Sequence, residues 1–471
     1  MIRGLILLLA CFLSVWAESP CAMCHPSQAA GYAQTPMGRS FAPAIIRAAS
    51  VVRHAGSRTE VTITPDKFQI RSGRLLASYP AVWQIGSGSH AAGYLTTIAG
   101  QLFQAPVAYY PNRNLWDVAP GYENLPHIDF NRRVTPECLF CHTSQSAQIT
   151  PVAISCERCH GNAEPHALHP TKTNVTNPAR LPPAQRAAVC EQCHLNGEAR
   201  IPQPNRKLED FRPGQALEDY LAIFVAVSPA EELKVISHSE QLAQSKCGPL
   251  WCGSCHKVHG EAVSITKTCQ GCHAQRPASH PRTEAACETC HMPKRQAVDG
   301  LHTAFTDHRI RRPGPPAPTL PTALALRAWR PGPNGDRNRG LALLAAGERN
   351  GSAAQLQESF RILSAAYPTH PNDPELLAAL GSLLFLKDQR EDAAKLLRAA
   401  IRLRPAFAPY HQKLGIILQS EAELNEAIRL DPYDETNYHL LAALVPSRKR
   451  ETLERFLQIN PQHLSTRKAL N

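Results

Sequence analysis

The residues best suited to chemistry in this sequence are cysteines, and most of them follow one spacing. The pattern Cys-x-x-Cys-His occurs seven times and uses 14 of the 16 cysteines, leaving only Cys11 and Cys247 outside it. The cysteines of the seven motifs are Cys21, Cys24, Cys138, Cys141, Cys156, Cys159, Cys190, Cys193, Cys252, Cys255, Cys269, Cys272, Cys287 and Cys290. The histidines that follow them are His25, His142, His160, His194, His256, His273 and His291.

A Cys-x-x-Cys pair alone fits a zinc half-site, a redox dithiol or a point of covalent haem attachment. Disulfide frameworks and zinc ribbons are indifferent to the residue after the second Cys, whereas c-type haem attachment requires a His there. Two thiols three positions apart reach the two vinyl groups at one edge of a porphyrin, and the adjacent His supplies the proximal axial nitrogen. The sequence therefore predicts seven covalently attached haems c, each held by two cysteines and ligated by the motif histidine.

Further histidines are available as distal ligands. Ten lie between residues 50 and 310, more than seven irons require. This surplus favours bis-His coordination, which gives low-spin irons without a vacant site. For each of them the alternative is a surface or supporting role. The ten candidates are His54, His90, His127, His166, His169, His238, His259, His280, His302 and His308.

The low aromatic content is consistent with haem groups occupying part of the protein core. Aromatic residues make up only 6% of the chain, and six motifs lie within the roughly 154 residues from Cys138 to His291. Haems attached so densely must lie close together. The formal charge of +11 is offset by two propionates per haem, so it is weak grounds for nucleic-acid binding, and no nucleic-acid motif is present.

Several longer stretches resemble the multihaem cytochromes with doubled CxxCH motifs, a group that includes the tetrahaem cytochrome of nitrifying bacteria and shares the haem packing of hydroxylamine oxidoreductase. The stretches are CERCHGNAEPH, WQIGSGSHAAGYL, NLWDVAPGYE, CEQCHLNGEARIP with FRPGQALEDY, CGSCHKVHG, and CETCHMPKR with FTDHRI, within about residues 20–310. The resemblance implies parallel and perpendicular haem pairs, mostly bis-His ligation and electron transfer. By position it points to His90, His166, His238 and His308 as distal ligands. Every motif here ends in His and none in Lys, so no catalytic haem is marked.

The N-terminus reads as an export signal. Arg3 precedes an apolar run from Leu5 to Ala17, which is too short to span a bilayer and is followed at once by polar sequence. We expect a signal peptide over residues 1–17 cleaved near Ala17, with lipoprotein processing at Cys11 as the alternative. The sequence predicts no later transmembrane segment, and hence an exported protein, either periplasmic or at the cell surface or outside the cell.

The remaining chain divides by composition. Residues 18–310 form the predicted multihaem domain, in which residues 50–110 have β-branched stretches typical of a small antiparallel sheet and residues 136–310 hold the six-haem cluster. A Pro/Gly-rich boundary at residues 311–336 predicts an extended linker.

Beyond the linker, residues 337–471 have no cysteine and repeat a tetratricopeptide pattern. Pro371 and Pro405 lie 34 residues apart, and the next copy ends at Pro432, seven residues short of that period. The expected fold is therefore mainly α, with a haem-packed cytochrome domain carrying a small antiparallel β insertion, followed by an all-α tetratricopeptide solenoid. Such solenoids usually present a concave face to a protein or peptide.

Three functions remain open from the sequence. The leading one is an exported heptahaem cytochrome that transfers electrons along contiguous haems and docks redox protein partners through its repeat domain. The alternative is a multihaem oxidoreductase acting on a small nitrogen or sulfur species at a haem with an open coordination site. The third is an assembly scaffold whose haems are structural. A high-spin signal separates the enzyme from the carrier, because bis-His iron is low-spin.

Overall fold

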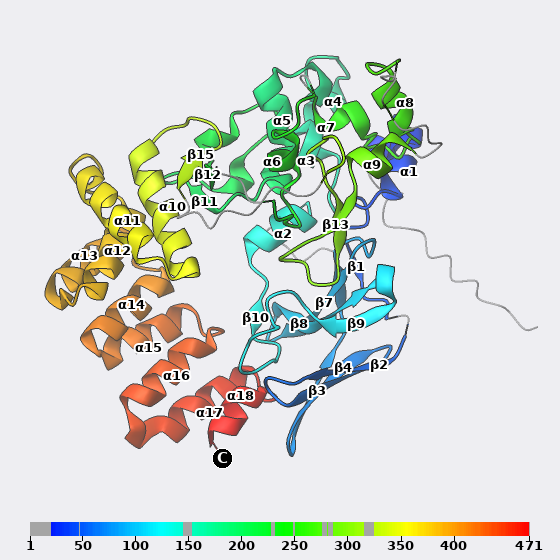
Figure 1. Ribbon diagram of the computed structural model, residues 1–471. Coiled ribbons are helices and arrows are strands. Elements are labelled where there is room, and N and C mark those ends of the chain that lie inside the picture. Colours follow the sequence, from blue (N-terminus) through cyan, green and yellow to red (C-terminus); the bar gives the residue numbers. More distant parts are fainter. Residues whose placement is uncertain are drawn as a thin grey trace, which may run out of the picture.

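The structure is a computed structural model that describes residues 20–46, 48–144, 153–227, 231–247, 250–275, 280, 286–314 and 325–470. The expected signal peptide lies outside these residues. Three parts follow one another along the chain: a β-rich part, a part that carries six of the seven motifs on short helices, and a helical-repeat part (Figure 1). Among the described residues no helix combines the length and the apolar character needed to cross a bilayer.

The β-rich part consists of two antiparallel sheets and is larger than the sheet expected over residues 50–110. One sheet has the order β1-β6-β7-β8-β10, with β9 paired to β8, and the other has the order β2-β3-β4-β5. The strands are β1 (Phe41–Pro43), β2 (Ser50–His54), β3 (Thr59–Ile63), β4 (Lys67–Ser72), β5 (Leu75–Pro80), β6 (Trp83–Ile85), β7 (Ala92–Ile98), β8 (Gln101–Tyr110), β9 (Leu115–Val118) and β10 (Arg132–Arg133).

The two sheets share one core. Alternate residues of β3 are buried, because successive side chains of a strand point to opposite faces. Val61, Ile63 and Phe68 of one sheet are fully buried with Val107 and Tyr110 of the other. The result is a sandwich with apolar inner faces. The motif-bearing part and the end of the helical-repeat part both contact this sandwich.

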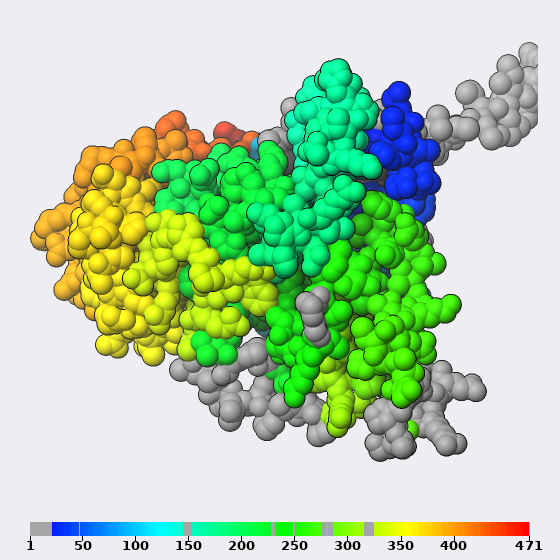
Figure 2. Space-filling model, turned by 90° about the horizontal axis from the view of Figure 1, so that it is seen from above, coloured from blue at the N-terminus to red at the C-terminus, as the bar shows by residue number. Residues whose placement is uncertain are grey.

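The motif-bearing part is built from short helices joined by loops. Its helices are α2 (Pro136–His142), α3 (Glu157–His160), α4 (Glu164–Leu168), α5 (Pro183–His194), α6 (His238–Leu242), α7 (Cys252–Cys255), α8 (Ile265–Gln270) and α9 (Cys287–His291), and the first motif precedes α1 (Pro26–Ala33). In the view from above, the blue N-terminal segment lies against teal and green segments that carry later motifs (Figure 2). Motifs far apart in sequence are therefore gathered in one region.

Two small sheets complete this part. The strands β13 (Lys294–Gln296) and β14 (Ala304–Thr306) form a hairpin, and β11 (Ala199–Pro202), β12 (Leu221–Ala226) and β15 (Leu326–Ala328) form a three-stranded sheet. β15 comes from the segment expected to be a linker. The segment after β15 also contacts the motif-bearing part, because the Arg330 guanidinium forms an ion pair with the Glu191 carboxylate at 2.6 Å.

The C-terminal part is a helical-repeat solenoid of the tetratricopeptide type. Its helices form antiparallel pairs that follow one another in an arc, coloured yellow to red in Figure 1. They are α10 (Gly335–Asn350), α11 (Ala353–Ala366), α12 (Pro374–Leu386), α13 (Arg390–Leu403), α14 (Ala408–Leu418), α15 (Glu421–Leu430), α16 (Glu435–Leu444), α17 (Lys449–Ile459) and α18 (Leu464–Leu470).

The helix spacing follows the repeat that the sequence predicts. α12 and α14 begin 34 residues apart, whereas α16 begins 27 residues after α14. Small residues sit where paired helices approach closely: a Cβ atom at Gly381 would lie 3.1 Å from the carbonyl oxygen of Ala393. Ala393 and Ala400 are fully buried.

Both ends of the solenoid pack on the rest of the molecule. α10 shares a core with the sheet of β11, β12 and β15. At the other end, the backbone N–H of Leu464 donates to the Asp129 carboxylate at 2.7 Å, and Arg467 donates to the carbonyl of Leu76 at 2.8 Å. The solenoid therefore connects the motif-bearing part to the sandwich and is held in place at both of its ends.

The contact between α18 and the sandwich contains a buried ion pair that predicts a pH dependence. His463 Nε2 lies 2.6 Å from Glu435 Oε2, and the His463 side chain is 1% exposed. Burial lowers the pKa of His463, but Glu435 and Asp129 outweigh burial and raise this pKa above its ordinary value of 6.5. Such a histidine stabilises the fold fully below pH 6.5, and the contribution is lost as the pH rises through the folded-state pKa.

We therefore expect the contact to weaken as the pH rises from about 6.5 through the folded-state pKa of His463. Burial raises the pKa of Asp129, so this group also favours the fold less as the pH rises, but in a lower pH range. Against the effect of burial, His463 lowers the pKa of Glu435, whose contribution to stability is lost only as the pH falls below 4.5. Unfolding midpoints measured across this range test the expectation, and a His463→Gln variant with an unchanged pH profile would contradict it. Other titratable groups facing this contact are Tyr79, Tyr122 and His439.

Candidate haem-binding sites

Each Cys-x-x-Cys-His motif is wound into a helical turn. In the first, third, fifth and sixth motifs the His N–H donates to the carbonyl of the first Cys at 2.8–2.9 Å, and the second, fourth and seventh motifs belong to α2, α5 and α9. Residues three apart on such a turn lie on the same side. Both thiols of a motif can therefore reach one edge of a flat macrocycle.

No disulfide joins the cysteines of the described residues, and several of their thiols come together between motifs. The thiols of Cys141 and Cys193 are hydrogen-bonded, which lowers the pKa of Cys141 to about 7 and raises that of Cys193. The thiols of Cys190 and Cys252 make the same kind of contact. The second, fourth and fifth motifs are thus immediate neighbours.

Four motif histidines each face a second imidazole supplied by another segment. His25 faces His166, with ring centroids 6.4 Å apart and ring planes 14° apart. The other three pairs have centroid separations of 6.0–6.1 Å and interplanar angles of 13–35°; they are His160 with His259, His256 with His308, and His291 with His280. All four partners belong to the set of candidate distal ligands.

These separations fit one metal ion between two rings. Metal–nitrogen bonds are about 2.0–2.1 Å long, so two ligating nitrogens stand about 4 Å apart, and each ring adds about 1 Å to its centroid. Among the described residues no three or more His, Cys, Asp or Glu side chains gather as a set able to hold a metal ion. A haem iron needs only two axial groups from the protein, because the porphyrin supplies its equatorial nitrogens.

Backbone carbonyls orient several of these imidazoles. The Nδ1 atoms of His160 and His291 lie 2.8 Å from the carbonyl oxygens of Thr176 and Arg311. The Nδ1 atoms of His166 and His308 make the same contact at 3.0 and 2.9 Å, with Thr171 and Thr306. A carbonyl only accepts, so Nδ1 carries the proton and Nε2 keeps its lone pair for a metal. This is the tautomer that axial ligation requires.

A group of partly buried histidines lies at the centre of the motif-bearing part. The His238 ring contacts His194 at 5.4 Å and His308 at 5.0 Å, both nearly perpendicular. Burial and neighbouring imidazoles lower the pKa of His238 to about 3 and that of His142 to about 4. These rings are therefore neutral at neutral pH, the form that binds metal ions.

His90 reaches the same region from the sandwich. Its ring packs on Phe305 at 4.3 Å, Phe305 in turn contacts His238, and the buried Nδ1 atoms of His90 and His238 have no hydrogen-bond partner. No proximal histidine is in ring contact with His90 in the described part of the chain. Of the four distal ligands that the resemblance points to, His166 and His308 thus face motif histidines most directly.

Four candidate histidines lie elsewhere or have other partners. Both ring nitrogens of His54 are engaged, with Ser57 at 2.8 Å and the Glu123 carbonyl at 2.9 Å. His302 Nε2 lies 2.6 Å from Asp117. The last two, His127 and His169, are exposed. These four are therefore not among the imidazoles that face a motif histidine.

Of the three other motif histidines, His194 contacts His238 edge-on, and two have no facing imidazole among the residues that the structure describes. They are His142, which is partly buried beside His194, and His273, which is exposed. These two motifs are the places to look for an iron with an open coordination position.

Gly31 on α1 allows the first motif to approach the segment of His259. A Cβ atom there would lie 2.0 Å from the His259 carbonyl oxygen, so Gly31→Ala must push the two backbones apart. We expect this change to lower the free energy of unfolding by about 1–3 kcal/mol, as overpacking does. Gly335→Ala is the control, because a Cβ atom there meets nothing within 4 Å. Equal denaturant midpoints for the two variants would contradict this account of the contact.

The groups that support the ligands were not identified from the sequence. Thr176 and Arg311 act through backbone carbonyls, which any residue type provides. The one signal in the sequence is the charged run DHRIRR at residues 307–312, which contains the candidate ligand His308.

Comparisons with known proteins add little information about these sites. No protein-family model and no curated protein matches the chain. Among solved structures it is similar to MamA, with 20% identity over 29% of this chain and 84% of that chain and a TM-score of 0.24. The corresponding values for MamA from Desulfovibrio magneticus RS-1 are 19%, 29%, 81% and 0.24. An O-GlcNAc transferase mutant from Thermobaculum terrenum gives 23% identity and a TM-score of 0.24, and the chain spans 26% of its length.

Proposed function

We propose that this protein is a multihaem c-type cytochrome that carries electrons. The observation that carries the proposal is the set of four motif histidines that face a second imidazole at 6.0–6.4 Å. The motif cysteines would hold seven haems c by thioether bonds. When bound, such a haem supplies one-electron exchange between ferric and ferrous iron.

The protein side chains have three tasks in this function. The cysteine pairs would hold each macrocycle at its helical turn. The paired imidazoles would be the protein's two ligands to one iron, which would leave no place there for water or a small substrate. The carbonyls of Thr171, Thr176, Thr306 and Arg311 hold the imidazole planes and increase the basicity of the ligands.

Electron paramagnetic resonance of the oxidised protein tests this function. We expect mostly low-spin ferric signals, because two imidazoles give a strong axial field. A spectrum dominated by high-spin iron would contradict the carrier function. A preparation with metal but without haem would contradict the whole proposal.

The solenoid is proposed to dock a redox protein partner. Its helix pairs are held at both ends, by the core shared with β11, β12 and β15 and by α18 on the sandwich. A solenoid held at both ends would keep a docked protein at a constant distance from the Cys-x-x-Cys-His motifs. Export to the periplasm or the cell surface is part of the proposal and rests on the sequence of residues 1–17.

A second function, reduction or oxidation of a small nitrogen or sulfur species, has its place at the sixth motif. His273 is exposed, and within the described ranges no imidazole lies in ring contact with it. A minor high-spin signal that changes in a His273→Ala variant and responds to added nitrite or sulfite would favour this function. A high-spin signal unaffected by both would count against it.

A further inference from the structure

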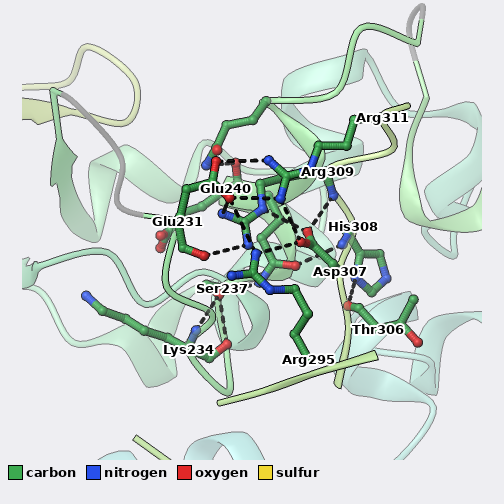
Figure 3. Close-up of polar contacts among 12 residues, drawn as sticks. Glu231, Lys234, Ser237, Glu240, Arg295, Thr306, Asp307, His308, Arg309 and Arg311 are labelled. Carbon is green, nitrogen blue, oxygen red and sulfur yellow. Dashed lines mark hydrogen bonds and ion pairs between the residues drawn. The ribbon is translucent and has the colours of Figure 1, made fainter. Parts of the chain in front are cut away.

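Five charged side chains form a connected group beside the candidate ligand His308 (Figure 3). We call this group the ion-pair cluster. It joins the loop after β12, the strand β13 and the segment that follows β14. Its members are Glu231, Arg295, Asp307, Arg309 and Arg311.

The centre of the cluster is buried. The side chains of Asp307 and Arg309 are only 2% and 3% exposed, and Arg309 Nε donates to Asp307 Oδ1 at 2.8 Å. Arg295 Nη1 reaches the other oxygen, Asp307 Oδ2, at 3.1 Å. Removing charges from water costs several kcal/mol per ion, so a buried ion pair is weak grounds for stability. Its presence here calls for another role.

Glu231 ties the outer arginines to this centre. Its two carboxylate oxygens accept from Arg311 Nη1 and Nη2 at 2.9 and 2.8 Å, a bidentate arrangement that fixes direction as well as distance. The backbone carbonyl of Glu231 accepts from Arg309 Nη2 at 3.0 Å. One residue therefore restrains both Arg309 and Arg311.

The cluster restrains the backbone on both sides of His308. Asp307 and Arg309 flank this histidine in sequence, and the N–H of Asp307 donates to the Pro293 carbonyl at 3.0 Å. The His308 N–H donates to Gln241 Oε1 at 2.9 Å. These contacts fix the position from which the His308 ring faces His256 at 6.1 Å.

The same cluster reaches a second imidazole through Arg311. His291 Nδ1 donates to the carbonyl of Arg311 at 2.8 Å, and the Arg311 N–H donates back to the His291 carbonyl at 3.3 Å. The side chain of Arg311 is held by Glu231, so Glu231 acts on His291 indirectly, through Arg311. His308 faces the fifth motif, whereas His291 belongs to the seventh.

We propose that the ion-pair cluster is a shared support that orients the axial imidazoles of two different irons, those of the fifth and seventh motifs. Glu231 and Asp307 are its positioning residues. Loss of the Glu231 charge should change both irons together and leave the other five unchanged. This inference rests on the proposed haem binding.

The test uses Glu231→Gln in the full-length, haem-loaded protein. Glutamine keeps the shape of the side chain but cannot balance three arginines. The matched control is Glu358→Gln, because Glu358 also holds an arginine with both oxygens, Arg361 at 2.7 and 2.8 Å, on the surface of the solenoid. Low-spin g values and midpoint potentials are recorded for every iron. Met substitutions at His308 and His280 identify which signals belong to the fifth and seventh motifs.

We expect Glu231→Gln to shift the g values of two of the seven irons and raise their midpoint potentials, and the control to shift none. Unchanged signals, or equal shifts of all seven irons, would overturn the proposal. If Glu231→Gln cannot be isolated with full haem content, Arg311→Lys, which keeps the charge but loses the bidentate contact, is measured in its place. If neither variant holds haem, the cluster serves folding and the proposal is wrong. Wild-type protein without haem would refute the proposed function instead.

Discussion

Replacing His166 with methionine is expected to raise the reduction potential of one iron by on the order of 0.2 V, within the span of about 0.8 V that axial ligands cover. Imidazole stabilises ferric iron better than a thioether, water or an empty position does. The His166 ring faces His25 at 6.4 Å with planes 14° apart. The change should therefore be confined to the haem of the first motif.

His169→Met is the matched control for this experiment. The two histidines lie three positions apart, but His169 is exposed at the C-terminal cap of α4 and has no ring contact with a motif histidine in the described residues. Spectroelectrochemical titration of both variants separates the two positions. A His166→Met protein whose potentials and low-spin signals match the wild type would contradict the pairing of His25 with His166.

Replacing Arg337 with methionine is expected to destabilise the solenoid by about 3–5 kcal/mol, the usual cost of removing one partner from a buried ion pair. The Arg337 side chain is 1% exposed, and its Nε donates to Asp373 Oδ2 at 2.8 Å. Its Nη1 donates to the carbonyl of Pro202 at 2.8 Å, which ties α10 to the edge of β11. Burial alone would raise the pKa of Asp373, but the hydrogen bond and charge of Arg337 lower it.

The control for Arg337 is Arg361→Met. Arg361 makes a similar ion pair with Glu358, but its side chain is 66% exposed, so solvent screens the pair and we expect a much smaller loss than for Arg337→Met. Denaturant unfolding followed by far-ultraviolet circular dichroism measures both. Asp373→Asn added to Arg337→Met should recover part of the loss, because it removes the uncompensated carboxylate. Equal losses for Arg337→Met and Arg361→Met would refute the role given to the buried pair.

Local features of the fold could be predicted from the sequence because they depend on neighbours along the chain. The Cys-x-x-Cys-His motifs are local in this sense, since each is wound into a single helical turn. The 34-residue period predicts the start of α14 from that of α12, and the shortened copy that follows appears as the 27-residue step to α16. The extent of the sandwich, which begins at Phe41 and ends at Arg133, was underestimated because several of its strands have only two to four residues.

Long-range pairings could not be predicted in this way. His166 follows the third motif in sequence but faces the histidine of the first, and Gly31 meets the carbonyl of His259, which follows the fifth motif. The contact of Leu464 with Asp129 joins residues 335 positions apart. Each of these residues is an ordinary member of its local sequence, and only the packing of distant segments gives it a role.

The most direct test of this account is the mass of the purified mature protein under denaturing conditions, after expression together with a working haem-attachment system. Thioether bonds survive denaturation, so seven motifs predict seven haem additions to the mass of the polypeptide. The same sample should show the reduced-haem absorbance of seven haems per chain. A mass equal to that of the bare polypeptide, or zinc bound in place of haem, would contradict the central claim.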